Sequence, residues 1–112
     1  MKISTRTEGD ICIVRVEEAR IDASAALAFK EGVREATQDA TATVILDLRD
    51  VMFIDSSGLG AIVATLKYLS PDRTLVLAGL TPPVRRVFEL TRMDSVMALF
   101  ETVDDALGRC RA

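Results

Sequence analysis

Short apolar runs alternate along this chain with segments whose apolar residues recur every three or four positions, and together they predict a series of strands and helices. Short apolar runs, several of them rich in Val and Ile, indicate strands at 2–7, 10–16, 43–48, 75–78 and 96–100. The first two strands are separated by Glu8-Gly9-Asp10, whose Gly-Asp pair is typical of a hairpin. A short bridging piece is expected at 20–22, before the first helix.

Segments in which apolar residues recur at intervals of three and four predict four helices between and after these strands. Ser24 is expected to cap the first helix, which ends near 37–41, and the second helix is expected over 57 to about 69. Pro82-Pro83 opens the third helix, because proline is well tolerated in a first turn. The residues expected on the apolar faces are, in helix order, Leu27, Phe29, Val33 and Ala36; Leu59, Ile62, Val63 and Leu66; Val84, Val87, Phe88 and Thr91; and Val103, Ala106, Leu107 and Cys110.

Strands separated by helical crossovers indicate a largely parallel sheet with a hairpin at its start. The chain has 112 residues, 49% of them hydrophobic and 28% charged, which suits one globular domain. The expected fold is a single α/β domain over 1–112, with a mixed, mostly parallel sheet of four to five strands and about four helices. We expect no extension, no signal peptide and, because no apolar run approaches about 18 residues, no membrane span; the expected location is the cytoplasm.

Charge and residue content exclude several functions. The formal net charge is −3, whereas nucleic acids and anionic membranes bind concentrated basic surfaces, so neither is an expected partner. The chain has no histidine, hence no Ser-His-Asp triad and no histidine metal ligand, and it has no Gly-Lys pair for a phosphate loop. Cys12 and Cys110 lie near opposite ends of the sequence and form no close pair. Cys12 falls inside an apolar run, which predicts a buried small hydrophobic residue, and Cys110 is expected to be a free thiol near the C-terminus. We therefore expect no enzymatic activity, no metal and no cofactor.

The segment with the most distinctive chemistry is the turn Asp55-Ser56-Ser57-Gly58, between a buried strand and the second helix. The first N–H groups of a helix lack partners and its dipole favours negative charge, so a phosphate on Ser56 would meet a favourable site. The residues alone allow a simpler interpretation, in which Ser56 and Ser57 are an N-cap pair, Asp55 is a turn residue and Asp22 forms an Asx-turn. Gly58 and Gly60 are costly inside a helix, and they permit close approach of either a neighbouring strand or a docked partner.

Together with the apolar strand at 44–48, the segment 55–60 resembles the STAS domain of bacterial anti-sigma factor antagonists. The segments 20–24, 84–91 and 100–107 resemble the first loop, third helix and closing strand-turn-helix of that family. The resemblance implies that Ser56 is phosphorylated by a serine-kinase anti-sigma factor and dephosphorylated by a metal-dependent serine phosphatase, and that Ser57 remains the helix cap. It also implies a partner-binding surface made of Asp22, Ser24, Asp55, Ser56, Ser57, Gly58, Leu59 and Gly60.

Two positions depart from the family pattern, because Ala19 and Arg92 stand where many members have glycine. Glycine is the usual left-handed residue after a helix, so Arg92 bears on how the third helix ends. The expected function is a partner switch in which the unmodified protein binds an anti-sigma factor and frees a sigma factor, and phosphorylation releases the complex. The alternative is a scaffold or subunit of a larger sensory signalling assembly, in which Ser56 tunes assembly.

Overall fold

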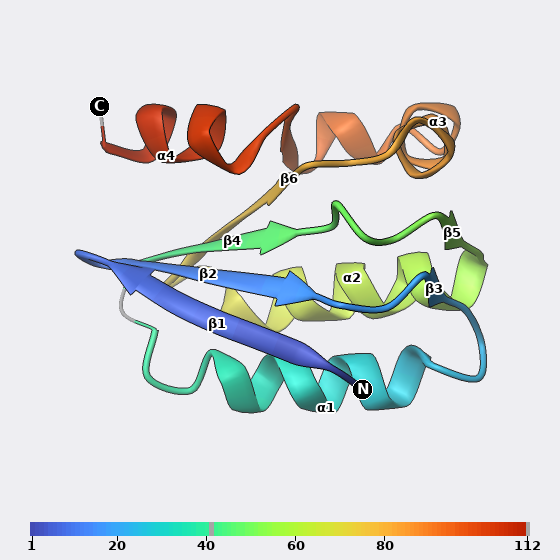
Figure 1. The fold of residues 1–112 in the computed structure, drawn as a ribbon, viewed down its shortest axis with the longest axis horizontal. Coiled ribbons are helices and arrows are strands. Elements are labelled where there is room, and N and C mark those ends of the chain that lie inside the picture. The colour runs from blue at the N-terminus through green and yellow to red at the C-terminus, as the bar shows by residue number, and fades with distance from the viewer. Residues whose placement is uncertain (41, 112) are drawn as a thin grey trace.

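The hairpin predicted at the start of the chain forms the edge of a five-stranded sheet in the computed structural model, which describes residues 1–40 and 42–111. Strand β1 (Ile3–Glu8) pairs antiparallel with β2 (Ile11–Val16). Strands β4 (Thr43–Asp47), β6 (Thr74–Ala78) and β7 (Ala98–Phe100) follow in parallel, giving the order β1-β2-β4-β6-β7. The mixed, mostly parallel sheet expected from the sequence is therefore confirmed (Figure 1).

Four α-helices occur in the described part of the chain: α1 (Ala26–Ala36), α2 (Ser56–Leu69), α3 (Pro82–Leu90) and α4 (Val103–Arg111). The parallel strands advance in one direction across the sheet, so crossovers of the same hand place α1, α2 and α3 on one face. Helix α4 follows the last strand and packs on the opposite face. The sheet is thus covered on both sides, which explains the continuous apolar runs of its central strands.

The side chains of the central strands divide between two cores. Val44 and Leu46 of β4 pack with Phe29, Ile62 and Phe88 in the larger core, beneath α1, α2 and α3. The alternate residues of the strands belong to the smaller core beneath α4, which comprises Ile11, Ile13, Ile45, Val76, Ala78, Val103, Ala106 and Leu107. This division follows from the period of two in a strand, which turns successive side chains to opposite faces.

Several predicted element ends and faces are wrong. Ser24 does not cap α1: the N-cap position is Ala25, without a side-chain cap, and the Ser24 hydroxyl donates to Asp22 instead. The end of α1 agrees with the prediction, because the helix ends at Ala36 with Thr37 as its C-cap; position 41 of the predicted range lies outside the described residues. Strand β7 begins at residue 98 rather than 96, since Val96 is the C-cap of a short 3₁₀ helix, η1 (Met93–Ser95), and has a helical backbone conformation.

The buried face of α2 is rotated from the predicted one. Its fully buried residues are Gly58, Ala61, Ile62, Thr65 and Leu69. Of the four residues expected on that face, Ile62 is buried, whereas Leu59, Val63 and Leu66 are half-buried and pack at its border. In α1, Phe29 and Val33 are buried as expected, but Leu27 is 63% exposed.

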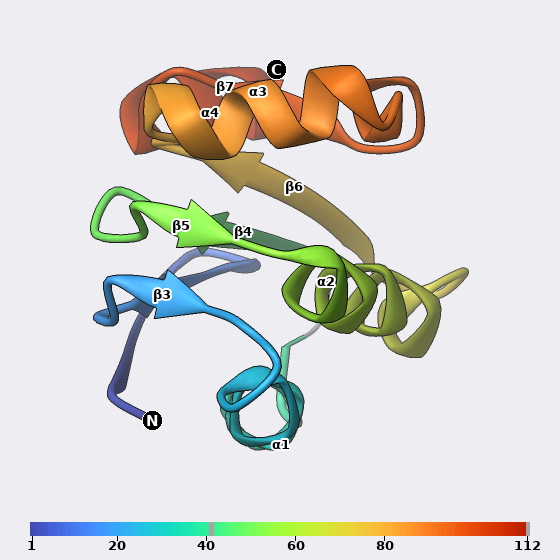
Figure 2. The same cartoon turned by 90° about the vertical axis from the view of Figure 1, so that its right-hand side faces the viewer.

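The sequence did not predict a second, two-stranded sheet. Strand β3 (Arg20–Ile21) coincides with the bridging piece, and it pairs in parallel with β5 (Phe53–Ile54). Each strand leads directly into a loop before a helix, β3 into α1 and β5 into α2. The pairing therefore places both loops at one end of the molecule, the end that faces the viewer in Figure 2.

Candidate functional site

Asp55 holds the two loops of this end together. One carboxylate oxygen, Oδ1, accepts a hydrogen bond of 2.9 Å from the Gly58 amide and so caps α2. The other, Oδ2, accepts one of 3.1 Å from the Ala23 amide in the loop before α1. Asp55 is thus both the N-cap of α2 and a tie between two segments that are far apart in the sequence, rather than a simple turn residue.

Ser56 and Ser57 are the first two residues of α2, so the expectation that they form the N-cap, or that Ser57 alone is the cap, is wrong. Both side chains are exposed. Between the residues that the structure describes, no hydrogen bond engages either hydroxyl, and the Gly58 amide is satisfied by the Asp55 carboxylate instead. The two hydroxyls therefore lie free at the positive end of the helix dipole.

The loop before α1 is organised by Asp22 through the Asx-turn that its residue type suggested. Its Oδ1 accepts hydrogen bonds from the amides of Ser24 and Ala25 and, at 2.7 Å, from the Ser24 hydroxyl. Its Oδ2 accepts one of 3.2 Å from Arg20 Nε. The Ser24 hydroxyl, followed by Arg20, holds the pKa of the Asp22 carboxyl below its usual range.

The two glycines at the start of α2 have different surroundings. A Cβ atom on Gly58 would lie 1.9 Å from the Ile21 carbonyl oxygen and 2.9 Å from Ile54 Cγ1. Of the two possibilities left open by the sequence, Gly58 thus permits the close approach of β3. A Cβ atom on Gly60 would meet no atom within 4 Å, so the exposed Gly60 is not required by packing within the described chain.

The structure brings most of the predicted partner-binding residues to one surface. Ser24, Ser56, Ser57 and Gly60 are exposed there, and Asp22, Asp55 and Leu59 are half-buried. Gly58 is buried beneath the loop and offers no contact surface, so this part of the prediction is wrong.

Sequence reasoning missed a cation and two apolar side chains beside this surface. The guanidinium of Arg20 lies over the Phe53 ring, 4.1 Å from its centroid, and pairs with Asp22. Phe53 is 39% exposed and its neighbour Met52 is 54% exposed. The sequence signal was the apolar Val-Met-Phe-Ile run immediately before Asp55. Such a run predicts buried side chains, but β5 carries Phe53 on its outer side.

This end of the molecule can present hydroxyls and apolar side chains to a protein partner. Among the described residues, no group of three His, Cys, Asp or Glu side chains could hold a metal ion. None of the described helices combines the length and the hydropathy needed to cross a bilayer.

Comparisons with known proteins agree with this architecture. The family model described as STAS domain matches residues 2–106. The anti-sigma-B factor antagonist of Staphylococcus aureus is 30% identical over 102 residues, which cover 90% of this chain and 94% of that protein. The crystal structure of an anti-sigma factor antagonist from Mycobacterium paratuberculosis matches with a TM-score of 0.84 and 27% identity, covering 99% of this chain and 94% of that one.

The fold is also shared with the anti-sigma factor antagonist SpoIIAA of Bacillus. Its unphosphorylated form matches with a TM-score of 0.75 at 24% identity, covering 98% of this chain and 96% of that one. Its phosphorylated form matches with a TM-score of 0.67 at 22% identity, covering 97% of this chain and 99% of that one.

Proposed function

The chain belongs to the STAS domain family, and on this premise we propose that it is an anti-sigma factor antagonist switched by phosphorylation of Ser56. The name of the Staphylococcus aureus relative supports the antagonist role. The choice of Ser56 over Ser57 follows the resemblance, because Ser56 is the serine directly after the aspartate. The observation that supports this site is that the exposed Ser56 hydroxyl stands at the first position of α2, while Asp55 performs the capping. A phosphate can therefore be added to Ser56 without breaking a described hydrogen bond of the fold.

The proposed switch is electrostatic. A phosphate adds about −1.5 to −2 charge at neutral pH, and the helix N-terminus stabilises this charge by up to about 2 kcal/mol, so the fold persists. In a complex, the same charge would be desolvated beside the carboxylate of Asp55, at a cost of several kcal/mol. A loss of about 4 kcal/mol lowers affinity roughly a thousandfold, which is enough to release an anti-sigma factor without a change in the backbone.

The proposed partners are an anti-sigma factor with serine-kinase activity, which binds the unmodified surface and phosphorylates Ser56, and a metal-dependent serine phosphatase, which restores it. The exposure of Ser56, Ser57 and Gly60 gives the kinase access to the acceptor hydroxyl. Met52 and Phe53 supply apolar contact area next to it, as protein interfaces require.

The test is to incubate the protein with its cognate kinase and to map the modified peptide by mass spectrometry. Phosphate should appear in wild type and in Ser57→Ala, and should be absent from Ser56→Ala. Affinity for the anti-sigma factor, measured by calorimetry, should fall at least about tenfold in Ser56→Asp and remain in Ser56→Ala. Thr7→Asp, an equal charge change on the exposed edge strand β1, is the matched control and should bind as wild type does.

Phosphate on Ser57 in the wild type would refute the choice of acceptor. If phosphorylated wild type and Ser56→Asp both bind the anti-sigma factor with unchanged affinity, the switch is wrong. The scaffold role in a larger sensory assembly would then be the remaining hypothesis.

A further inference from the structure

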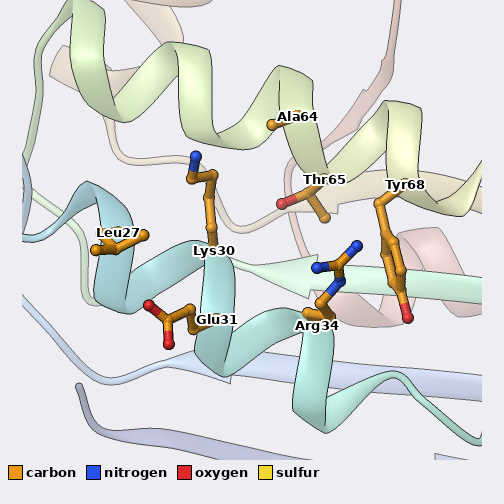
Figure 3. A pocket seen from close by; sticks show the side chains of 7 residues that line it. All are labelled: Leu27, Lys30, Glu31, Arg34, Ala64, Thr65 and Tyr68. Carbon is orange, nitrogen blue, oxygen red and sulfur yellow. The ribbon is translucent and has the colours of Figure 1, made fainter.

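Helices α1 and α2 enclose a groove that lies outside the surface described above. It is a hollow of about 280 Å³ (Figure 3). It is lined by one stripe of α1 and a short stretch of α2, namely Leu27, Lys30, Glu31 and Arg34, and Ala64, Thr65 and Tyr68. The spacing of the α1 residues is that of a single helix face, beside the buried stripe of Phe29 and Val33.

Two cations stand on this face one turn apart. Lys30 and Arg34 are related as i and i+4, a like-charge arrangement that destabilises a helix. In Figure 3 both side chains rise from α1 toward α2, whereas the carboxylate of Glu31 is turned away from them. The ion pairs found among the described residues include neither cation. Within the described chain, no ion pair therefore neutralises either cation, and an anion between the two helices would relieve their repulsion.

An aromatic side chain closes one end of the groove. The guanidinium of Arg34 lies over the Tyr68 ring, 4.6 Å from its centroid, and that of Arg73 lies 5.2 Å from it. Arg73 also donates a hydrogen bond of 2.6 Å to the Thr37 carbonyl at the end of α1. The ring thus contacts two cations, and these contacts favour its position as a wall of the groove.

The rest of the lining is apolar or small. Leu27 is 63% exposed at the other end of the groove, although it is a large hydrophobic side chain. Ala64 leaves room in the middle, and the Thr65 hydroxyl beside it is already engaged by the Ala61 carbonyl. The groove therefore combines an apolar body with a positive side, in a chain whose net charge is −3.

We propose that this groove binds a small organic anion, a monocarboxylate attached to an apolar or aromatic body. Lys30 and Arg34 bind the carboxylate through charge-assisted hydrogen bonds, and Tyr68, Ala64 and Leu27 contact the body. The hollow lies at the lower end of the volumes typical of small-molecule sites, so the ligand has about the size of one ring with a short chain. The site is separate from Ser56, and the inference does not rest on phosphorylation.

The test is a titration of the ¹⁵N-labelled protein with 3-phenylpropionate, followed by amide chemical shifts. We expect saturable shifts confined to the facing residues of α1 and α2. The uncharged 3-phenylpropionamide, which has the same body, and acetate, which has the same charge, should each bind at least about tenfold more weakly.

Variants locate the site. Lys30→Gln combined with Arg34→Gln should weaken binding of 3-phenylpropionate at least about tenfold. Ala64→Leu should do the same by filling the hollow. Arg86→Gln, an exposed cation on α3, is the matched control and should leave the affinity unchanged. Absence of saturable shifts, equal binding of the amide, or unchanged affinity in the double variant would each overturn the proposal, with thermal melts showing that every variant is folded.

Discussion

At the scale of single residues, two glycines of α2 show how little sequence type says about role. Gly58 and Gly60 are two positions apart in the same helix, and sequence reasoning treated them alike. The Ile21 carbonyl oxygen fills the space that a side chain of Gly58 would need, whereas the space beside Gly60 is open. The first glycine is therefore required by packing, whereas the second is not, and it lowers the stability of the helix.

The first prediction compares their alanine variants. Gly58→Ala should lower the free energy of unfolding by at least about 2–3 kcal/mol, because the new methyl group collides with backbone that must shift. Gly60→Ala should raise it by about 0.5–1 kcal/mol, since alanine is the better helix former. Urea unfolding of both variants measures the difference, and equal effects of the two substitutions would show that the approach of β3 is not tight.

Arg92, one of the two departures from the family pattern, adopts a conformation that glycine usually occupies. It follows α3 with φ 60° and ψ 24°, in the left-handed region, while its carbonyl accepts hydrogen bonds from the Ser95 amide and hydroxyl. A non-glycine residue in this region costs about 1–2 kcal/mol. The segment after α3 therefore adopts the left-handed conformation that glycine provides, but at the expense of backbone strain.

The second prediction is that Arg92→Gly stabilises the protein. The relief of strain is partly offset by about 0.4–1 kcal/mol, because glycine makes the unfolded chain more flexible. The net gain should be a few tenths to about 1 kcal/mol in urea unfolding. Arg92→Ala, which removes the same charge and keeps the strain, is the control; a gain of the same size in that variant would assign the effect to charge.

At the scale of elements, α2 shows the limit of reading a helix face from hydrophobicity. Leu59, Val63 and Leu66 are larger and more apolar than Gly58, Ala61 and Thr65, yet the smaller residues are the buried ones. The reason is the proximity of α2 to β3 and to α1, because a close approach selects small side chains at the contact. The larger residues then pack around its border.

The third prediction distinguishes the two faces. Ile62→Ala should lower the free energy of unfolding by about 2–5 kcal/mol, the cost of a cavity in a closed core. Leu66→Ala would cost as much if the face read from the sequence were right. Because Leu66 is half-buried, we expect about half of that loss. Chemical denaturation of both variants measures these free energies. A larger loss of stability in Leu66→Ala than in Ile62→Ala would show that the face predicted from the sequence is the buried one.

At the scale of the whole molecule, ion pairs tie segments at the loop end of the sheet. Arg15 of β2 donates hydrogen bonds of 2.8 and 3.2 Å to both carboxylate oxygens of Asp50, in the loop after β4. This contact holds the pKa of the Asp50 carboxyl below its usual range. The pKa of Asp22 is lowered by Ser24 and Arg20, and that of Glu17 by Ser4 and then by Lys2.

The fourth prediction follows from the sign of these shifts. A carboxyl whose pKa is lower in the folded than in the unfolded chain stabilises the fold above its unfolded pKa, about 3.9 for Asp and 4.3 for Glu. That stability is lost as the pH falls through the lower folded values. The free energy of unfolding should therefore be constant above about pH 5 and fall toward about pH 3. In Asp50→Asn the fall should be shallower, and an unchanged slope would show that the Arg15 contact contributes nothing.

Much of the fold could be predicted because its signals are local. The strands 43–48 and 75–78 differ from the structure by at most one residue at each end, and Pro82 begins α3 as expected. The predictions that failed concern short or shared features. Each strand of the β3–β5 pair has two residues, too few for a periodic pattern, and Ser24 loses its expected role as a cap because Asp22 binds its hydroxyl.

The sequence by itself determined the order and type of the long elements and located the Asp-Ser-Ser-Gly turn, since hydrophobic period and turn chemistry act over a few neighbouring residues. Only the tertiary structure decided that Asp55 caps α2 and binds the Ala23 amide 32 positions away, and that Gly58 lies beneath Ile21. Only the tertiary structure set Lys30 and Arg34 across from Tyr68 in one groove. These features depend on which distant segments meet, and that is fixed by the packing of the whole sheet and its helices.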